Sequence, residues 1–438
     1  MTMPDLRGTT DAARERAAAS GRTVLATVSV PADGHLALPD HPDAGLWIEP
    51  GFAAAGAGVA AEAVASGQDR FDRLATELDR RFGDAVADGG RPFAFTGGAF
   101  AQGDGWPGFP DARAWIPEIA LVRDASGTRL VATVAVAPDD DGADERLREL
   151  LEAGLPGPSR GGLAAAPYAT FTPDNAAYEA AVQEALDAIE DGTLAKVVLA
   201  RRMRMRSAVG ISPSALADAL AERYPACFTF AQRRGDLAFV GASPELLVAR
   251  EERTVRATPA AGTVADSAQP SESRKLAGGL DTVKARWEQE LVADAVYDVL
   301  EPLCEEVSTH LPMVVPAGPV QHLATTVEGR LREPIHVLEL VRALHPTPAV
   351  GGVPLDEARS FIDAHEGFDR GWYAGPIGIA RPDGSGSFAL ALRCALIAGN
   401  DLDLFAGAGI VEGSIPREER QEIDLKLGAV AAVLTPES

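Results

Sequence analysis

The sequence predicts an α+β fold, in which antiparallel strands and helices are mixed along the chain. The first observation is a series of short strands joined by turns, which runs from Phe228 to Thr263. The second is a set of helical segments with an apolar repeat, such as residues 175–191 and 282–300. Because helices do not separate each strand from the next, the strands are expected to pair in antiparallel sheets.

The first 167 residues are expected to be rich in strands. Alternating patterns predict strands at 23–30, 91–100 and 120–136, and an Ala-rich helix is expected from about Ala60 to Phe82. Residues 138–167 are acidic and rich in Gly and Pro around one short amphipathic helix, as in a surface connection. Nothing in this part is arranged in a way that points to chemistry.

Helices and strands follow one another less regularly after residue 167. The elements expected there are a helix at 175–191, a strand at 194–205, a helix at 213–223, hairpin strands at 228–263 and a last helix at 417–434. No internal repeat with a solenoid period is visible. The change in character divides the chain into a strand-rich part, 1–165, and a second part, 166–438, which carries the motifs described below.

Composition and charge narrow the classes of function. The chain has 438 residues, of which 46% are hydrophobic, enough for one large domain or two ordinary ones. Lys and Arg number 40 against 64 Asp and Glu, which gives a formal net charge of -24. This sign opposes binding to phosphate backbones, so no nucleic-acid partner is expected. A small anionic substrate would need local cations or a metal ion.

Cysteine usage and the first residues predict a cytoplasmic protein. Only Cys227, Cys304 and Cys394 occur, without a CxxC pair, so neither a disulfide framework nor a thiolate zinc site is expected. The segment 1–22 is polar where a signal peptide needs an apolar centre, and apolar stretches elsewhere are too short to span a membrane. We therefore expect no membrane attachment.

The last predicted helix turns charged residues toward the core. At about 100° per residue, Glu419, Glu422 and Lys426 fall on the same face as Val430 and Val433. Carboxylates on such a face are candidates for binding a ligand or metal. The alternative is a solvated first turn in which the Glu residues complement the helix dipole.

A second helix offers another inward acid. Glu288 borders the apolar stripe that contains Val292 and Val299 in the segment 282–300. Two helices that each present a carboxylate suggest a site for a hard cation. Mg²⁺ suits oxygen ligands better than Zn²⁺, and no His or Cys cluster accompanies these acids. The alternative is a buried salt bridge to a Lys or Arg.

Two basic residues are expected to point inward from strands. Arg393 would share a strand face with Ala391 and Ala395, whose small side chains leave room for a carboxylate beside the guanidinium. Lys196 would share its face with Val198, in an apolar setting that disfavours the charged ammonium form. A structural ion pair for Arg393 and an exposed edge position for Lys196 are the alternatives.

Glycine-rich runs occur at 260–263, 351–352 and 406–414. They lack the GxxxxGKS and GxGxxG patterns, so a nucleotide site is not expected. They are expected to form turns, which either present backbone N–H groups to carboxylates of a ligand or have no further role.

A series of motifs gives the chain a specific resemblance. The motifs KVVLAR, GASPELL, ATPAAGT, VQHLATTVEGRL, LHPTPAVGG, FDRGWYAGPIG, ALRCALI and AGAGIVEGS followed by ExxExxxKL occur in this order. From about Tyr168 to Leu434 the chain thus resembles the chorismate-utilising enzymes, a family that includes isochorismate, salicylate, anthranilate and aminodeoxychorismate synthases. The resemblance implies two large packed antiparallel sheets with helices outside, with residues 1–165 in the same compact unit. It also implies a monomer.

The resemblance assigns roles to the candidate residues. It implies that Glu288 and Glu422 bind Mg²⁺, and that Glu419 is a nearby ligand or contacts the ion through water. The implied substrate contacts are Lys426 as a cation, Arg393 and Tyr373 at the enolpyruvyl carboxylate, the Gly262–Thr263 backbone at the ring carboxylate, His322 near the ring, and Ala349 and Gly409 beside it.

The resemblance also indicates which reaction to expect. Lys196 stands where members that use water carry Lys, and Ala261 stands where aminodeoxychorismate synthases carry a nucleophilic Lys. This implies a Mg²⁺-dependent isomerase in which Lys196 activates water for attack at C2 of chorismate, while Glu245 protonates the departing C4 hydroxyl. Isochorismate would serve menaquinone, siderophore or other aromatic biosynthesis. For Glu245 the alternative is an exposed hairpin position.

Two alternatives and three departures accompany this assignment. Salicylate synthase is the nearest rival, but Ala349 stands where salicylate-forming relatives usually carry Thr. A non-catalytic chorismate-binding relative is the other alternative. The chain departs from the usual family pattern at three positions, where Ala285, Gln289 and Ile423 replace Asp, His and Thr.

Overall fold

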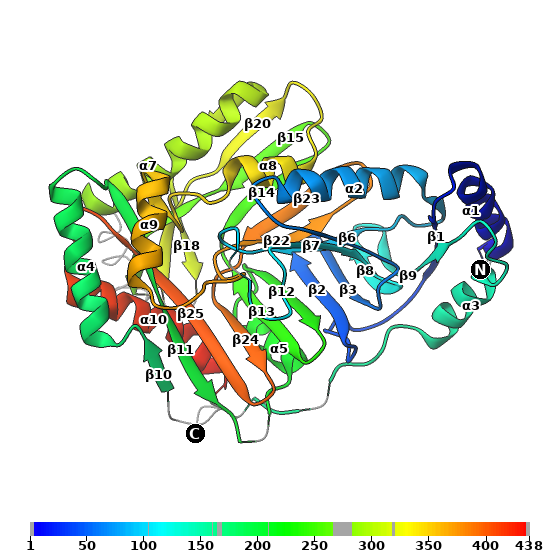
Figure 1. Cartoon of the computed structure of the whole chain (residues 1–438), viewed down its shortest axis with the longest axis horizontal. Helices are drawn as coiled ribbons and strands as arrows, with labels where there is room; N and C mark the ends of the chain where they lie inside the picture. The colour runs from blue at the N-terminus through cyan, green and yellow to red at the C-terminus, as the bar shows by residue number, and fades with distance from the viewer. Residues whose placement is uncertain are drawn as a thin grey trace.

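The computed structural model describes residues 4–103, 105–159, 161–163, 169–208, 210–265, 283–317 and 320–434. These residues form two large sheets and one small sheet, with helices around them (Figure 1).

The larger sheet has 13 strands. They are β1 (Val24–Pro31), β2 (Asp43–Glu49), β3 (Phe52–Ala57), β5 (Val86–Asp88), β8 (Ile119–Asp124), β9 (Gly127–Val136), β10 (Ala169–Thr172), β11 (Lys196–Arg206), β12 (Phe228–Arg234), β13 (Leu237–Ser243), β21 (Gly352–Val353), β24 (Cys394–Ala398) and β25 (Asp401–Ile410). Their order is β10-β11-β25-β24-β13-β12-β2-β3-β8-β9-β1-β5, with β21 paired to β11 outside this path. The β1–β5 pair is parallel and its neighbour β1–β9 is antiparallel.

The second large sheet has nine strands and the small sheet has three. The nine strands, in their order across the sheet, are β17 (Cys304–Thr309), β20 (Val327–Leu331), β15 (Thr254–Thr258), β14 (Leu246–Glu251), β23 (Gly386–Leu390), β22 (Pro376–Ala380), β6 (Ala94–Gly98), β7 (Ala112–Ile116) and β4 (Ala61–Ala65). The small sheet has the order β16 (Ala260–Ala265), β19 (Val320–Ala324) and β18 (Met313–Ala317).

Helices cover the outside of the sheets. They are α1 (Leu6–Ser20), α2 (Arg70–Asp84), α3 (Ala143–Ala153), α4 (Asn175–Glu190), α5 (Pro213–Arg223), α7 (Val283–Leu300), α8 (Val337–Leu344), α9 (Leu355–His365) and α10 (Pro416–Leu434), with a short 3-10 helix at Glu301–Leu303. In Figure 1, α4, α9 and α10 flank β11 and β25, while α2 and α8 lie together at the other sheet. Among the described residues, no helix is both long and apolar enough to cross a membrane.

The two large sheets pack face to face through aromatic side chains. Phe95 of β6 and Trp115 of β7 stack with ring centroids 4.9 Å apart. They lie against Gly45 of β2, where a Cβ atom would come within 2.9 Å of both rings. Trp115 also donates a hydrogen bond to Gln232 of β12 across the interface, at 3.2 Å. The expected α+β fold with packed antiparallel sheets is confirmed.

Strands from the first 136 residues lie in both large sheets. β2 pairs with β12 in the larger sheet, and β6 pairs with β22 in the nine-stranded sheet. The change in sequence character near residue 165 therefore does not separate one sheet from the other.

Three local predictions were wrong or incomplete. The helix expected at 60–82 begins only at Arg70, because Ala61–Ala65 pairs with β7 as an edge strand. The strand expected through Arg393 is interrupted, since β23 ends at Leu390 and β24 begins at Cys394 in the other large sheet. α1 was not expected. Its start is capped by Asp5, which accepts a hydrogen bond from the backbone N–H of Gly8.

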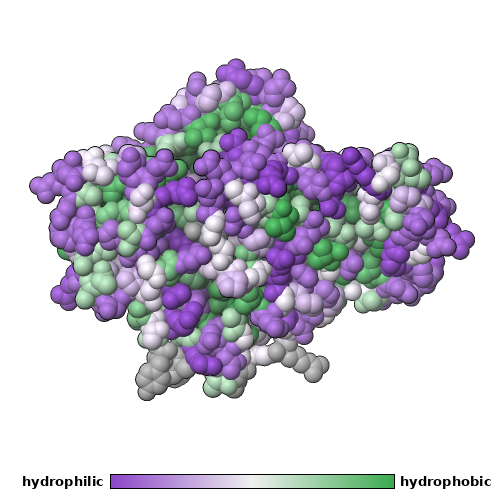
Figure 2. All heavy atoms as spheres, in the orientation of Figure 1, coloured by the Kyte–Doolittle hydropathy of each residue, from purple (hydrophilic) through white to green (hydrophobic). Residues whose placement is uncertain are grey.

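Hydrophilic residues cover most of the molecular face in Figure 2, and hydrophobic residues form smaller groups among them. This surface fits a composition with 64 acidic residues, because charged side chains stay in contact with water. The buried charged residues are the exceptions, and several of them gather around one pocket.

Candidate active site

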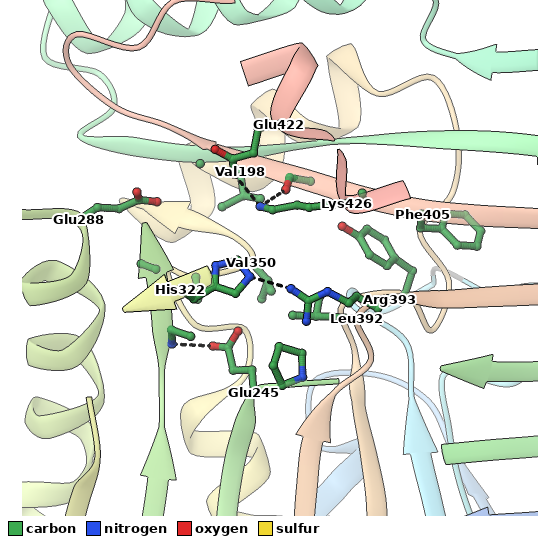
Figure 3. A pocket seen from close by; sticks show the side chains of 18 residues that line it. Val198, Glu245, Glu288, His322, Val350, Leu392, Arg393, Phe405, Glu422 and Lys426 are labelled. Carbon is green, nitrogen blue, oxygen red and sulfur yellow. Dashed lines mark hydrogen bonds and ion pairs between the residues drawn. The ribbon is translucent and has the colours of Figure 1, made fainter. Parts of the chain in front are cut away.

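A pocket opens where the larger sheet, the small sheet and helices α7 and α10 meet (Figure 3). Nine of the thirteen predicted site residues line it. Its walls are Val198, Pro244, Glu245, Ala260, Ala261, Glu288, His322, Ala349, Val350, Tyr373, Leu392, Arg393, Phe405, Ala406, Gly407, Gly409, Glu422 and Lys426. The pocket therefore collects residues from Val198 to Lys426, which are far apart in the sequence.

Lys196 lies at the start of β11. It does not line the pocket itself but contacts Glu288, which does. Its side chain is 1% exposed, so the alternative of an exposed edge position is wrong. Its Nζ atom is 2.9 Å from Oε1 of Glu288, which does line the pocket. The salt bridge considered as the alternative for Glu288 is thus present. Gly409 of β25 makes room for this pair, since a Cβ there would lie 2.4 Å from the Glu288 carboxylate.

Helix α10 supplies two charged side chains to the pocket. Lys426 Nζ lies 2.7 Å from Oε1 of Glu422 and donates a hydrogen bond to the carbonyl oxygen of Gly407 at 2.9 Å. Glu419, one turn earlier, is buried but is not among the residues that line the pocket. The predicted inward face of this helix is confirmed, and the alternative of a solvated first turn is wrong for Glu419.

Glu245 is a buried acid of the pocket whose pKa is raised. It follows Pro244 between β13 and β14, and it is 4% exposed, so the alternative of an exposed hairpin position is wrong. Burial raises its pKa to about 7, although the backbone N–H of Ala260 and the charge of Lys196 act in the opposite direction. That N–H donates to Oε1 of Glu245 at 3.4 Å. Near neutral pH the carboxyl group can therefore hold a proton.

Arg393 presents unused hydrogen-bond donors. It sits where the chain passes from one large sheet to the other, with a positive φ of 46°. This crossing, and not the expected strand alternation, turns its side chain into the pocket. The residue is 6% exposed, and its Nε and Nη1 atoms have no hydrogen-bond partner among the described residues. The neighbouring thiol of Cys227 is a weak acceptor at best. Two unused donors of a buried guanidinium suit a bound carboxylate.

His322 contacts Arg393 directly. The Nη2 atom of Arg393 is 2.7 Å from Nε2 of His322 (Figure 3). Because a guanidinium cannot accept a hydrogen bond, Nε2 must be the acceptor. His322 is therefore a neutral imidazole whose proton is on Nδ1.

The remaining predicted substrate residues lie near this pair. Tyr373 is buried, its ring stacks on Phe405 at a centroid distance of 5.3 Å, and burial raises the pKa of its hydroxyl. Ala349 lines the pocket with its methyl group. Gly262 and Thr263 belong to β16, where Thr263 pairs with His322. Their side-chain surroundings, like that of Ala285, lie outside the described part of the structure.

Several pocket residues were not predicted. Gly407 and Phe405 lie two and four positions before Gly409 on β25, and all three line the pocket. The period of two along a strand, applied to Gly409, would have found them. Of the runs expected to form turns, residues 260–263 lie in β16 and the first part of 406–414, up to Ile410, lies in β25, while a turn follows at 412–413.

A buried ion pair supports the pocket walls from behind. Arg370 Nε donates to Glu366 Oε2 at 2.8 Å, and both side chains are 2% exposed. Arg370 also donates to the carbonyl oxygens of Val198 and Val350, at 2.7 and 2.8 Å. Ala200 N donates to Glu366 Oε1 at 2.7 Å. The pair thereby ties β11 to the segment that carries Ala349.

The carboxylates partly fit a metal ion. Glu288 and Glu422 line the same pocket from two different helices, and Mg²⁺ commonly takes one or two carboxylates together with water and substrate oxygens. Each carboxylate lies beside a lysine amine. In the described ranges, no three His, Cys, Asp or Glu side chains form a cluster that could hold a metal. Glu419 does not line the pocket, and the prediction that these acids bind Mg²⁺ stays a prediction.

Comparisons with known proteins show which family the chain resembles. A family described as chorismate binding enzyme matches residues 44–435. The salicylate biosynthesis isochorismate synthase of Pseudomonas aeruginosa is 34% identical, over 98% of this chain and 94% of the relative. The isochorismate synthase DhbC of Bacillus subtilis is 38% identical, over 58% of this chain and 66% of the relative.

A solved structure extends the similarity to the fold. The menaquinone-specific isochorismate synthase MenF of Escherichia coli superposes with a TM-score of 0.81 at 26% identity, covering 94% of this chain and 95% of that chain. The family match begins at residue 44, so it includes most of the strand-rich part as well as the motifs after residue 166. The chain therefore belongs to the chorismate-binding enzyme family.

Proposed function

We propose that this protein is an isochorismate synthase, an isomerase that converts chorismate to isochorismate with the help of Mg²⁺. The observation that carries the proposal is the arrangement of one pocket. It combines a buried acid, Glu245, with a buried guanidinium that has unused donors, Arg393, and with Lys196 behind Glu288. The names of the relatives support the same reaction, because they are isochorismate synthases.

The substrate is held by charge and by shape. Chorismate carries two carboxylates, one on the ring and one on the enolpyruvyl group. Arg393 Nε and Nη1 bind the enolpyruvyl carboxylate, since these are buried donors without partners. Lys426, which α10 contributes to the pocket lining, adds a second positive charge. Mg²⁺, held by Glu288 and Glu422, would neutralise the ring carboxylate and orient the ring.

The chemistry exchanges one hydroxyl group for another. Lys196 takes a proton from water, and the water oxygen forms a bond to C2 of the ring. The two ring double bonds shift, and the C4–O bond breaks. Glu245 gives its proton to the departing C4 oxygen, which leaves as water. One water enters and one water leaves, so the product is an isomer of the substrate. The raised pKa of Glu245 suits this role as a proton donor near neutral pH.

Salicylate formation is the competing outcome in the same pocket. It would require elimination of pyruvate from isochorismate after the first step. The wall at Ala349 offers only a methyl group, without a hydroxyl that could assist the elimination. The P. aeruginosa relative, whose name includes salicylate biosynthesis, is itself named an isochorismate synthase. These observations favour release of isochorismate.

A proton NMR time course of the purified protein with chorismate tests the proposal. The sample is followed with Mg²⁺, then with excess EDTA, and then after Mg²⁺ is restored. We expect isochorismate to accumulate to an equilibrium mixture only while free Mg²⁺ is present, and the same mixture to form from isochorismate. Salicylate with pyruvate would assign the alternative reaction. No conversion in either direction would indicate a protein that binds chorismate without turnover.

A further inference from the structure

The side chain of Gln289 is enclosed on helix α7 and both ends of its amide are used. The residue is 1% exposed. Its Oε1 atom accepts a hydrogen bond from the backbone N–H of Ala261 at 2.7 Å, and its Nε2 atom donates to the carbonyl oxygen of Pro259 at 3.0 Å. A buried amide that meets two backbone groups fastens the helix to the segment that carries them.

The two backbone groups belong to an extended segment. Pro259 and Ala261 flank Ala260 at the point where β15 ends and β16 begins. A neighbouring strand would pair with the carbonyl of one residue and the N–H of the residue two positions later, and the amide of Gln289 does the same. The carbonyl oxygen of Pro259 also accepts a hydrogen bond from the backbone N–H of Thr325 at 3.1 Å, and Ala260 and Ala261 pair with β19. Gln289 therefore adds a second attachment, from α7, to a segment that strand pairing already holds on its other side.

The fastened segment carries parts of the pocket. Ala260 and Ala261 line it, and the N–H of Ala260 donates to the carboxyl group of Glu245. On the helix side, Glu288 directly precedes Gln289 and contacts the amine of Lys196. The amide of Gln289 thus connects two parts of the site. One is the Ala260–Ala261 segment, which contacts the proposed acid Glu245, and the other is the helix that carries Glu288, which contacts the proposed base Lys196.

We infer that Gln289 is a positioning residue of the isomerisation, which sets the distance between the Ala260–Ala261 wall of the pocket and the helix that bears Glu288. This inference rests on the proposed function. The step needs an acid and a base on defined sides of one ring, so a shift of one wall by about 1 Å lowers the rate on the order of 100-fold. Gln289 does not touch the ring itself and acts through Ala260 and Glu288.

The test compares the variant Gln289→Met with the wild-type enzyme. Met keeps nearly the same length and volume but can form neither hydrogen bond. We expect kcat for isochorismate formation to fall at least about tenfold. KM for chorismate should change far less, because the carboxylate contacts of Arg393 are not altered. A purely structural role would instead lower the fraction of folded enzyme and leave kcat per folded molecule unchanged.

Two further variants sharpen the comparison. Glu290→Gln is the matched control, because Glu290 is the next residue of α7 and is exposed, and we expect it to keep wild-type kcat and KM. Gln289→His offers one neutral ring nitrogen to the segment, and we expect it to keep more of the wild-type kcat than Met does. Should the Met variant unfold, the same split between kcat and KM is measured on the His variant.

The outcomes separate the two claims. A wild-type enzyme that forms isochorismate, together with a Gln289→Met variant of unchanged kcat, would overturn the role of Gln289 alone. A wild-type protein that leaves chorismate unchanged would overturn the proposed function and this inference with it. A selective loss of kcat in Gln289→Met, with partial recovery in Gln289→His, is the expected result.

Discussion

The Nζ atom of Lys196 lies 2.9 Å from Oε1 of Glu288, and both residues are buried. The residue proposed to activate water is therefore in contact with a residue proposed to bind Mg²⁺. Because a carboxylate that binds a cation has fewer lone pairs for an amine, the state of Glu288 and the availability of Lys196 are connected.

Replacement of Lys196 tests the base directly. Lys196→Met fills the same buried space without a titratable group. We expect kcat to fall at least about 100-fold, the contribution typical of a general base. Binding of chorismate, measured by calorimetry, should persist, and circular dichroism should show an intact fold. A variant that turns over at the wild-type rate would remove Lys196 from the mechanism.

A substitution at Gly409 tests the packing around the ion pair of Lys196 and Glu288. In Gly409→Ala the new Cβ would lie 2.4 Å from Oε1 of Glu288 and 3.1 Å from Cε of Lys196. We expect a loss of activity of at least about tenfold from displaced reacting groups. The control is Gly428→Ala on α10, where a Cβ meets nothing within 4 Å. It should keep full activity and gain about 0.5–1 kcal/mol in unfolding free energy, measured by urea denaturation.

A substitution of Arg393 tests the proposed contact with the enolpyruvyl carboxylate of chorismate. Arg393→Lys keeps a positive charge but removes the fork of N–H donors, two of which have no partner in the described part of the chain. We expect KM for chorismate to rise about 10-fold or more, since hydrogen bonds to charged groups contribute about 1.5–3 kcal/mol. Arg206→Lys serves as the control, because Arg206 lies on β11 with a side chain that is 76% exposed. Equal KM values for both variants would contradict the assignment.

The raised pKa of Glu245 predicts how activity and stability depend on pH. Its pKa of about 7 lies above the ordinary value of 4.5, so the folded protein retains a proton that the unfolded chain loses. Stability should therefore decrease as pH rises from about 4.5 to about 7. Glu245→Gln removes this dependence and should raise the unfolding free energy at pH 8 by up to about 3 kcal/mol.

The same group acts as a proton donor in the proposed reaction, so kcat/KM of the wild-type enzyme should fall as pH rises above about 7. The measurement is a pH–rate profile combined with urea unfolding at pH 5 and pH 8. A profile that stays flat up to pH 9 would show that Glu245 does not supply the proton. A Gln variant no more stable than the wild type at pH 8 would show that the carboxyl group carries no burial penalty.

The sequence predicted features that depend on local periodicity. Helical phase placed Glu288 and Glu422 on inward faces, and the hairpin pattern predicted the strands between Phe228 and Thr263. The resemblance added Tyr373 and Ala349, which carry no pattern of their own. Local patterns failed where pairing partners decide the structure. The Ala-rich segment 61–65 has a weak strand preference, yet it forms a strand because β7 offers a partner.

Contacts between residues that are far apart in the sequence could not be predicted from local patterns. Arg393 reaches the pocket because the chain changes sheets next to it, and no periodicity marks such a crossing. The contact between Lys196 and Glu288 joins a strand to a helix that lies far along the chain. The same is true of Gln289, whose two hydrogen bonds to Pro259 and Ala261 depend on how α7 packs.

The strand order has a consequence for synthesis on the ribosome. β2 and β3 can pair as soon as they emerge, but the other edge of β2 is completed only by β12, which comes much later in the chain. During that interval the nascent protein exposes a strand edge that can pair with other chains. Synthesis of this enzyme should therefore depend on chaperones, and slow translation between β3 and β12 should increase aggregation.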